Sequence, residues 1–516
     1  MDQISKPAIT NVLKNENIKF FPKKFKSTYR YWLENIKDWN ISRQLSWGHR
    51  IPAFYYGENK EEYVVAQNKN EAKKIIEKQK GLKLKDDKLI QDEDVLDTWF
   101  SSWLWPISVF DGIRNPENQE IKYYYPTQDL VTGPDIIFFW VARMIISGYE
   151  FRDEKPFSNV YFTGIVRDKL RRKMSKQLGN SPDAIELIDK YGADSVRVGL
   201  MLSSAAGNDL LFDESLCQQG KNFTNKLWNA LRLVNGWEVD DGKEISEVNS
   251  LALEWYENKF NQVLDLINKN YENYRISDVL MSSYRLVWDD YCSWLLESVK
   301  PEFGEKIDNQ TKSKIISLFE DNLKLLHPFM PFLTEEVWSW LGERRTPEEA
   351  LIVSEWPEAE EIKGDLLNDL DVLKEIVGGV RNIRKDNGIA NREKLELKIQ
   401  KAEGYPKGLD SAISHLTNLE SIDEVSEKVE GAFGFMVGRH RFYIPFGDGF
   451  DMEAEKLKIQ KDLDYQKGFL KSVRGKLSNE NFVSGAPDSV VANERKKEAD
   501  AIAKIEIMQE KLLDLG

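Results

Sequence analysis

The segment Val160–Asn180, VYFTGIVRDKLRRKMSKQLGN, begins as an apolar, β-branched run and then becomes strongly basic. It places the single acid Asp168 within ten residues that carry Arg167, Lys169, Arg171, Arg172, Lys173 and Lys176. The whole chain has a formal net charge of −14, so this cluster is a local exception. A solvated face is the commonest role for such a cluster. A strand leading directly into it indicates a second role, in which lysines above a parallel sheet reach the phosphates of a nucleotide.

The sequence around this segment alternates between strand-like and helix-like stretches. NVYFTGIV (159–166) predicts a strand, and GPDIIFFWVARMII (133–146) predicts a buried strand or helix. SPDAIELIDKYG (181–192) predicts a helix with Ser181 as its N-cap and Pro182 at its first position. This alternation is typical of an α/β layer with a parallel sheet.

Length and composition describe a globular protein of several domains. A chain of 516 residues exceeds one hydrophobic core, and its 41% hydrophobic and 31% charged content is usual for soluble domains. No apolar run reaches the length of a membrane span, and the first residues lack the apolar centre of a signal peptide. The two cysteines and four histidines show no metal-ligand spacing, so we expect a cytoplasmic protein without bound zinc.

The pattern changes after residue 209. Segments up to residue 370 carry apolar residues at helical spacing and predict a helix bundle. Residues 371–450 include the strand-like pieces LELKI and HRFYIPF and predict a small mixed α/β segment. In residues 451–516 two charged helices flank SNENFVSGAPDSV, which predicts an antiparallel coiled coil. The apolar positions of its first helix are Ile459, Leu463, Leu470, Val473 and Leu477.

RKMSKQLGN (172–180) resembles the KMSKS loop of class I aminoacyl-tRNA synthetases, with Gln177 in place of the last serine. The blocks DVLDTWFSSWLWPIS and YYPTQDLVTGPDIIFFWVARMI precede it in the order typical of valyl-tRNA synthetases. Downstream, LLHPFMPFLTEEVWSWL resembles the anticodon-binding helical domain of that family, and KLSNENFVSGAPDSVVANER resembles its coiled-coil arm. The chain is therefore similar to valyl-tRNA synthetases over nearly its whole length.

This resemblance implies five parts. Residues 1–27 would be the end of the editing insertion, and residues 28–208 the C-terminal half of a Rossmann-like catalytic domain with the KMSKS-type loop. Residues 209–370 would be the all-α anticodon-binding bundle, 371–450 the small α/β segment, and 451–516 the coiled-coil tRNA-binding arm. The His-x-Gly-His signature of the family does not occur in the sequence. We therefore expect a partial chain that forms valyl-adenylate poorly by itself.

The resemblance also assigns an ATP site. Lys173, Ser175 and Lys176 take the catalytic roles, in which the lysines stabilise pyrophosphate and the serine donates its hydroxyl. Gly133 backs the adenosine and Asp135 binds the ribose hydroxyls, although a helix N-cap at Asp135 fits the local sequence equally well. The implied ATP-binding residues are Gly133, Asp135, Gly164, Val166, Lys173, Met174, Ser175 and Lys176.

The implied valine pocket needs small, rigid, apolar walls, because one methylene contributes only ~1–3 kcal/mol of discrimination. By resemblance, this half of the fold supplies Trp47, Val95 and Trp99. Ordinary core packing is the alternative role for each of them. In the basic loop, Arg171 occupies a position where the family commonly has glycine, which predicts a stiffer loop.

The implied activity is that of a valine–tRNA ligase, which activates valine with ATP and Mg²⁺ and transfers it to tRNA(Val). Arg381 and Arg384 are implied tRNA contacts, and surface charge is their alternative role. We expect the complete protein to be monomeric and not to bind membranes. The competing hypotheses are an isoleucyl-tRNA synthetase fragment and a non-catalytic tRNA-binding module. DTWFSSWLWP favours valine, and the two KMSK lysines favour an enzyme because binding alone needs neither.

Overall fold

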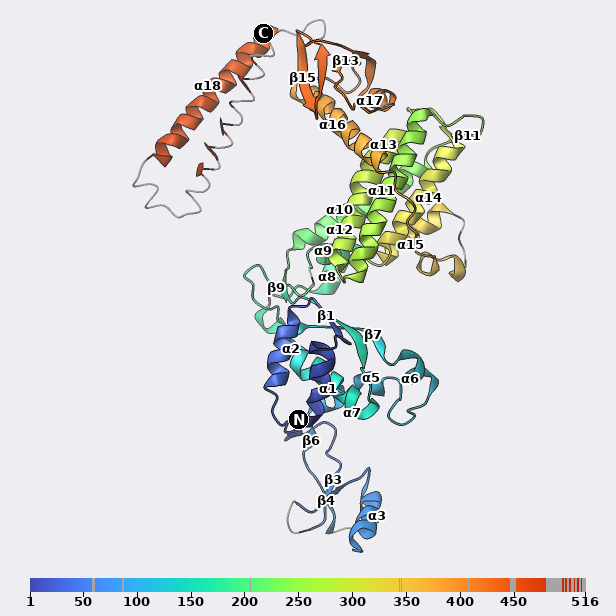
Figure 1. The fold of residues 1–516 in the computed structure, drawn as a ribbon, viewed down its shortest axis with the longest axis vertical. Coiled ribbons are helices and arrows are strands. Elements are labelled where there is room, and N and C mark those ends of the chain that lie inside the picture. Colours follow the sequence, from blue (N-terminus) through green and yellow to red (C-terminus); the bar gives the residue numbers. More distant parts are fainter. Residues whose placement is uncertain are drawn as a thin grey trace.

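The computed structural model arranges the chain as a series of units along one long axis (Figure 1). At one end lies a small unit with α3, followed by an α/β unit, a helix bundle, and a second sheet beside α16 and α17. The structure describes residues 1–57, 61–85, 88–204, 206–342, 344, 346–406, 408–445, 452–478, 494–495, 497–498, 501–502, 505, 508–509 and 512.

The α/β unit is built on three parallel strands in the order β1 (Lys19–Phe21), β8 (Phe157–Phe162) and β7 (Thr127–Thr132). Buried rings of Phe20, Phe157 and Phe162 fill its core. The helices of this unit are α1 (Asp2–Leu13), α2 (Phe25–Glu34), α4 (Thr98–Ser102), α5 (Trp105–Ser108), α6 (Gln119–Tyr124), η2 (Pro134–Ile136), η3 (Ile137–Ala142) and α7 (Arg143–Arg152). The apolar run 133–146 is therefore helical, one of its two predicted states.

The first residues of the chain belong to this same core. Ala8 and Val12 of α1 are buried with Ile145 of α7, and β1 supplies an outer strand of the sheet. The structure describes the residues on both sides of the boundary predicted between residues 27 and 28. Their side chains pack in one continuous core. The division into an editing-insertion end and a catalytic half therefore stays a prediction from resemblance and does not mark two cores.

Residues 51–91 form a small unit with a core of its own, which the sequence did not predict. Its antiparallel strands are β4 (Tyr63–Val65), β3 (Ala53–Tyr55) and β5 (Ile90–Gln91), with α3 (Lys69–Lys80) packed against them. A two-stranded ladder of β2 (Ser42–Arg43) and β6 (Val95–Leu96) joins this unit to the α/β unit. The two segments that connect the small unit to the α/β unit therefore lie side by side.

The basic segment follows β8. The chain forms β9 (Val166–Arg167), which pairs with β10 (Leu210–Leu211), then the short turn η4 (Lys176–Leu178). Helices α8 (Ala184–Tyr191) and α9 (Ala193–Leu202) come next. The predicted N-cap Ser181 is wrong by two residues, because Asp183 caps α8 by accepting a hydrogen bond from the Ile185 N–H at 2.7 Å.

The helix bundle follows as predicted. Its elements are α10 (Glu214–Asn235), β11 (Val239–Asp240), α11 (Glu247–Glu272), α12 (Ile276–Arg285), η5 (Leu286–Leu295), α13 (Leu296–Val299), β12 (Ile307–Asp308), α14 (Asn309–Leu326), α15 (Pro331–Leu341), η6 (Pro347–Glu349) and η7 (Leu351–Val353). Two hydrogen-bonding side chains of α9 hold the end of the bundle that lies next to α9. Asp194 accepts from the Leu333 N–H at 2.6 Å, and Arg197 donates to the Phe329 carbonyl at 3.1 Å. The helices after the basic segment are therefore tied directly to the bundle.

The second sheet shares a continuous hydrophobic core with the bundle through α16 (Gly364–Asp386). Its strand order is β14 (Leu419–Glu424), β13 (Leu395–Gln400), β16 (His440–Pro445) and β15 (Ala432–Val437), and α17 (Asp410–Thr417) packs beside it. This confirms a mixed α/β arrangement after the bundle. Because α16 begins at Gly364, the helix crosses the boundary predicted at residue 370.

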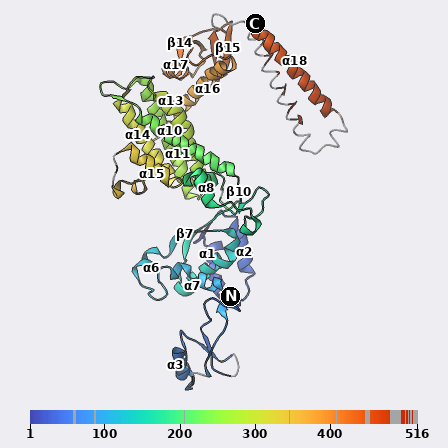
Figure 2. The same ribbon diagram turned by 180° about the vertical axis from the view of Figure 1, so that it is seen from behind.

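Helix α18 (Met452–Leu477) stands beside the second sheet and apart from the bundle, as Figure 2 shows from behind. Arg474 pairs with Glu498 at 2.8 Å and Lys476 with Glu494 at 3.5 Å, so the chain returns alongside the end of α18. Most of the second predicted helix lies outside the described residues. The coiled coil therefore stays a prediction.

Candidate active site

Strand β7 ends at Thr132 and delivers Gly133 and Asp135 to the edge of the sheet. The turn η2 begins after Gly133 without a side-chain cap, so Asp135 is not an N-cap here. A Cβ atom on Gly133 would lie 2.6 Å from Asp135 Oδ1, so glycine leaves room for this carboxylate to lie along the strand end. The Asp135 side chain is half exposed. It is therefore open to a polar ligand at the carboxyl end of β7.

The basic loop, residues 166–180, begins as a tight hairpin. Arg167 bridges to Lys173 in antiparallel fashion, and the Met174 N–H donates to the Val166 carbonyl at 3.4 Å. Arg171 lies at the tip with φ +64°, in the left-handed region that favours glycine. This backbone geometry gives a physical reason for glycine at the position, where the present chain carries an arginine.

Asp168 and Asn180 hold the two ends of the basic loop together. Asp168 accepts from the Leu170 and Arg172 N–H groups, both at 2.9 Å, and from Asn180 Nδ2 at 3.0 Å. Asn180 Oδ1 in turn accepts from the Ser175 N–H at 2.9 Å. The hydrogen bond from Asn180, with those from Arg172, lowers the pKa of Asp168 to about 2. A fully ionised carboxylate therefore organises the backbone around the lysines.

The basic loop meets the end of β7 through one contact. Lys173 Nζ lies 3.4 Å from Asp135 Oδ2, and both side chains are largely open to solvent. The two predicted site residues are thus neighbours in space although 38 positions separate them. Ser175 follows Lys173 by two positions, and its hydroxyl accepts from the Gln177 N–H at 3.2 Å. The side chain of Lys176, at the start of η4, lies outside the described residues.

Gly164 and Val166 lie on the connection between β8 and the basic loop. A Cβ atom on Gly164 would lie 1.7 Å from the Asn208 carbonyl oxygen, so only glycine allows the two backbones to pass. Asp209 accepts from the Ile165 N–H at 3.2 Å and pairs with Arg167, which lowers its pKa. These contacts fix the entry to the basic loop, and the role of Gly164 in ATP binding stays a prediction.

The predicted pocket residues occupy different environments. Val95 is buried, and a Cβ atom on Gly48 would lie 3.0 Å from it, so the Trp47–Gly48 backbone crosses directly over Val95. Trp99 is half-buried and stacks on Phe139 with ring centroids 5.8 Å apart. The Trp47 side chain is 91% exposed. Val95 and Trp99 are therefore each held by packing against other residues, whereas the Trp47 side chain is open to solvent.

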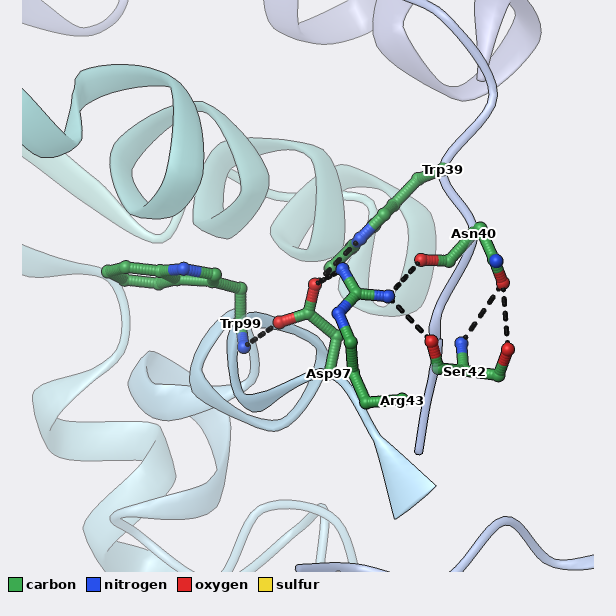
Figure 3. Close-up of polar contacts among 6 residues, drawn as sticks. All are labelled: Trp39, Asn40, Ser42, Arg43, Asp97 and Trp99. Atoms are coloured by element: carbon green, nitrogen blue, oxygen red, sulfur yellow. Dashed lines mark hydrogen bonds and ion pairs between the residues drawn. The ribbon is translucent and has the colours of Figure 1, made fainter. Parts of the chain in front are cut away.

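A buried carboxylate lies between Val95 and Trp99. Asp97, only 6% exposed, accepts from Trp39, Arg43 and the Trp99 backbone, and Figure 3 shows these groups converging on it. The guanidinium of Arg143 lies 3.5 Å from the centre of the Trp39 ring. Burial lowers the pKa of Arg143 to about 10, and its Nη1 atom has no hydrogen-bond partner among the described residues. We call Trp39, Arg43, Asp97, Trp99 and Arg143 the Asp97 cluster.

Sequence reasoning missed the carboxylates that organise both regions. Asp168 precedes a turn and Asp97 precedes a short helix, which are the positions where Asp side chains bind nearby N–H groups. These local signals were present in the sequence. The sequence did not predict that Arg43 pairs with Asp97 or that Asn180 bonds to Asp168, because each contact depends on how the chain folds back.

Three stretches of the chain match known families. Residues 1–213 match tRNA synthetases class I (I, L, M and V), residues 254–399 match the anticodon-binding domain of tRNA ligase, and residues 451–516 match the valyl tRNA synthetase tRNA binding arm. A valine–tRNA ligase of Christiangramia forsetii is 54% identical over the whole chain, and that of Parabacteroides distasonis is 51% identical. Over its whole length the chain is therefore similar to proteins named valine–tRNA ligase.

The chain spans 59% of the length of the Christiangramia forsetii relative and 58% of the Parabacteroides distasonis relative. Among solved structures, a LeuRS from Agrobacterium radiobacter K84 in ternary complex with tRNA and LeuAMS has a TM-score of 0.48 at 18% identity. That likeness covers 64% of this chain and 43% of the LeuRS chain. The relatives' names and the match to a valyl arm favour valine over the isoleucyl alternative.

Two arginines were predicted to contact tRNA, and the structure gives them different surroundings. Arg384 is only 3% exposed and donates to the carbonyls of Ala390 and Thr417, both at 2.9 Å, and of Asn418 at 3.2 Å. Its prediction as a tRNA contact is wrong in this structure, because the guanidinium is enclosed and already bonded. Arg381, one turn earlier on α16, is exposed. Among the described residues it donates one long hydrogen bond, to the Leu416 carbonyl at 3.4 Å, and its guanidinium lies 5.7 Å from the centre of the Trp294 ring.

Two further structural features concern possible metal sites and membrane-spanning helices. Among the described residues, no group of three or more His, Cys, Asp or Glu side chains is placed to hold a metal ion. No helix in the described part of the chain combines the length and apolarity needed to cross a membrane. Both observations apply only to the residues that the structure describes.

Proposed function

We propose that this chain supplies the phosphate-binding loop, part of the valine pocket and the tRNA-binding surface of a valine–tRNA ligase. The enzyme would activate valine with ATP, accompanied by Mg²⁺, and transfer the aminoacyl group to tRNA(Val). The observation that carries this proposal is the contact between Lys173 and Asp135 at the carboxyl ends of parallel strands. Nucleotides bind at such strand ends in α/β sheets. A cation and a carboxylate there suit phosphates and ribose hydroxyls respectively.

In the first step, a carboxylate oxygen of valine would attack the α-phosphorus of ATP, and the bond to the β,γ-diphosphate would break. Negative charge then grows on the departing pyrophosphate. Lys173 and Lys176 would stabilise that charge, and Ser175 would donate a hydrogen bond to a phosphate oxygen. Asp135 would hold the ribose, with Gly133, Gly164, Val166 and Met174 lining the nucleotide. Because Lys173 already faces solvent, ATP phosphates can compete with Asp135 for it.

Arg381 and the outer surface of the bundle would bind the tRNA backbone. Such contacts are electrostatic and weaken steeply with salt. A monomer and a cytoplasmic location complete the proposal. Cys217 and Cys292, both buried without a disulfide, fit a reducing compartment. A non-catalytic tRNA-binding module is less well supported, because tRNA binding alone would not require Lys173 beside Asp135.

Valine-dependent ATP–pyrophosphate exchange tests this function. The chain would be measured alone and after addition of the remaining portion of the Christiangramia forsetii relative, since the chain spans only 59% of that protein. We expect weak or no exchange alone, valine-dependent exchange after addition, and loss of exchange with Lys176→Ala. Exchange that stays absent with the added portion, while tRNA(Val) still binds, would support the non-catalytic module instead.

A further inference from the structure

We propose that Asp97 is a positioning residue for the valine pocket, and that it fixes Trp99 to the rigid core of the α/β unit. This inference depends on the proposed function, because it assigns a role within the same site. Asp97 itself is buried. Its effect would pass through Trp99 and Val95, which flank it in the sequence.

One oxygen of Asp97 holds the main chain that carries Trp99. Oδ1 accepts from the Trp99 N–H at 2.9 Å and so caps α4 at its first turn. The Asp97 N–H donates to the Ile41 carbonyl at 2.7 Å, next to the β2–β6 ladder that includes Val95. Both predicted wall residues in this stretch are therefore fixed by hydrogen bonds within two residues of Asp97.

The other oxygen of Asp97 is held by two side chains. Oδ2 accepts from Trp39 Nε1 at 3.1 Å and forms an ion pair with Arg43 (Figure 3). Arg43 also donates to the carbonyls of Asn40 and Ser42, both at 2.7 Å, so its guanidinium cannot rotate without losing bonds. A carboxylate that is only 6% exposed needs such a partner, because an unpaired buried charge is costly. The carboxylate is therefore held in one orientation from both sides.

Aromatic packing connects this carboxylate to α7. Trp39 is covered by the Arg143 guanidinium at 3.5 Å from its ring centroid and meets the Trp103 ring edge-on at 5.8 Å. Arg143 is itself only 6% exposed. On the far side, Trp99 stacks on Phe139 of η3. Asp97, the one carboxylate of the Asp97 cluster, therefore joins the Trp99 main chain to a rigid, buried layer.

Such rigidity has a specific use in a valine pocket. Discrimination against a substrate that differs by one methylene depends on a wall that does not yield. A displacement of about 1 Å can cost on the order of 100-fold in rate. Removal of Asp97 should therefore affect valine recognition more than ATP recognition.

The test uses three variants in the exchange assay with the added relative portion. Asp97→Ala removes the cap of Trp99, whereas Asp97→Asn keeps an acceptor oxygen and loses the charge. Asp308→Ala is the matched control, because Asp308 is a buried N-cap in the helix bundle and accepts from the Thr311 N–H at 2.7 Å. Amide hydrogen exchange of residues 95–103 in the chain alone gives a readout that is independent of activity.

We expect Asp97→Ala to raise KM for valine about tenfold, leave KM for ATP within about twofold, and accelerate amide exchange in residues 95–103. Asp97→Asn should recover most of the valine KM, and Asp308→Ala should leave it unchanged. Equal changes in both KM values, an unchanged valine KM, or the same shift in Asp308→Ala would each overturn the inference. If the wild-type protein shows no valine-dependent exchange, the proposed function itself is wrong and this inference falls with it.

Discussion

The basic loop and the Asp97 cluster both place a carboxylate beside cations, but the cations differ in how they are bonded. The Asp168 side chain is 13% exposed and accepts from the backbone, Arg172 and Asn180, and the nearby Lys173 is 64% exposed. Asp97 is buried among aromatic rings and pairs with Arg43, whose guanidinium also donates to two backbone carbonyls. The first arrangement leaves Lys173 largely open to an anionic ligand, whereas the Arg43 guanidinium in the second is already bonded on several sides.

This difference matches the two tasks that an adenylating site must perform. Surface ion pairs are weak and exchange readily, so a loop built from them can give its lysines to phosphates. Buried polar groups that are fully bonded rigidify their surroundings and specify one geometry. Under the proposed function, the molecule would separate a yielding phosphate side from a rigid amino-acid side.

The largest expected effect concerns the exposed lysine. Lys173→Ala should lower kcat for ATP–pyrophosphate exchange about 100-fold, because one preorganised donor to the growing phosphate charge is lost. Steady-state kinetics with the added relative portion would measure it. Lys169→Ala is the matched control in the same loop, since Lys169 already pairs with Asp213 at 2.9 Å. The control should change kcat less than about fivefold. Equal losses in both variants would mean that the loop acts only through its total charge.

The contrast between enclosed and exposed cations recurs on α16. Arg384→Ala should lower the free energy of unfolding by about 3 kcal/mol, because three backbone carbonyls lose a charged donor. Urea unfolding would measure this loss. Arg381→Ala should leave stability almost unchanged and reduce the slope of log K for tRNA(Val) against log salt by about 1. A large stability loss in Arg381→Ala, or a changed salt slope in a folded Arg384→Ala protein, would reverse the two roles.

The pKa of Asp168 predicts how the basic loop responds to acid. Its pKa lies at about 2, below the ordinary value of 3.8, so the carboxylate stabilises the loop above pH 3.8 and loses that effect as the pH falls through 2. NMR of protein with labelled aspartate carboxyl carbons, with Asp168→Asn used for assignment, should find this group titrating near 2. Titration at the ordinary value would show that the bonds from Asn180 and Arg172 do not hold in solution.

The smallest expected effect lies at the tip of the basic loop. Arg171 has φ +64°, which costs an L-residue roughly 1–2 kcal/mol that glycine does not incur. Arg171→Gly should therefore slow the amide exchange of residues 166–174 or leave it unchanged, since the extra freedom of glycine in the open state offsets part of the gain. Lys169→Gly, at a position without positive φ, should accelerate exchange in the same segment. Faster exchange in Arg171→Gly would contradict the strained geometry.

Contiguous features of the site were predictable from the sequence. The strand, the lysines and the capped helix occur in one short stretch, and Gly133 and Asp135 follow a strand in the same way. The strand and the helix could be predicted from their immediate neighbours, whereas the roles of the lysines, Gly133 and Asp135 came from the resemblance. The contact between Lys173 and Asp135 then follows from two parallel strands ending at one edge.

Features that depend on long-range packing were not predictable. Arg384 and Arg381 have the same charge and lie one turn apart, and only the fold buries one of them. The run 133–146 is apolar throughout, so periodicity could not distinguish a buried strand from a helix. The side-chain partners of Asp97, Trp39 and Arg43, lie more than fifty positions away in the chain, where no local pattern indicates them.

The central claim is that the basic loop acts on ATP and the Asp97 cluster acts on valine. Measuring KM for valine, KM for ATP and kcat side by side in Lys173→Ala and Asp97→Ala tests it most directly. The account predicts a crossed result, in which Lys173→Ala impairs kcat or the ATP KM alone and Asp97→Ala raises the valine KM alone. If both variants change the same parameter by similar factors, the two regions are not separate in function and the account is wrong.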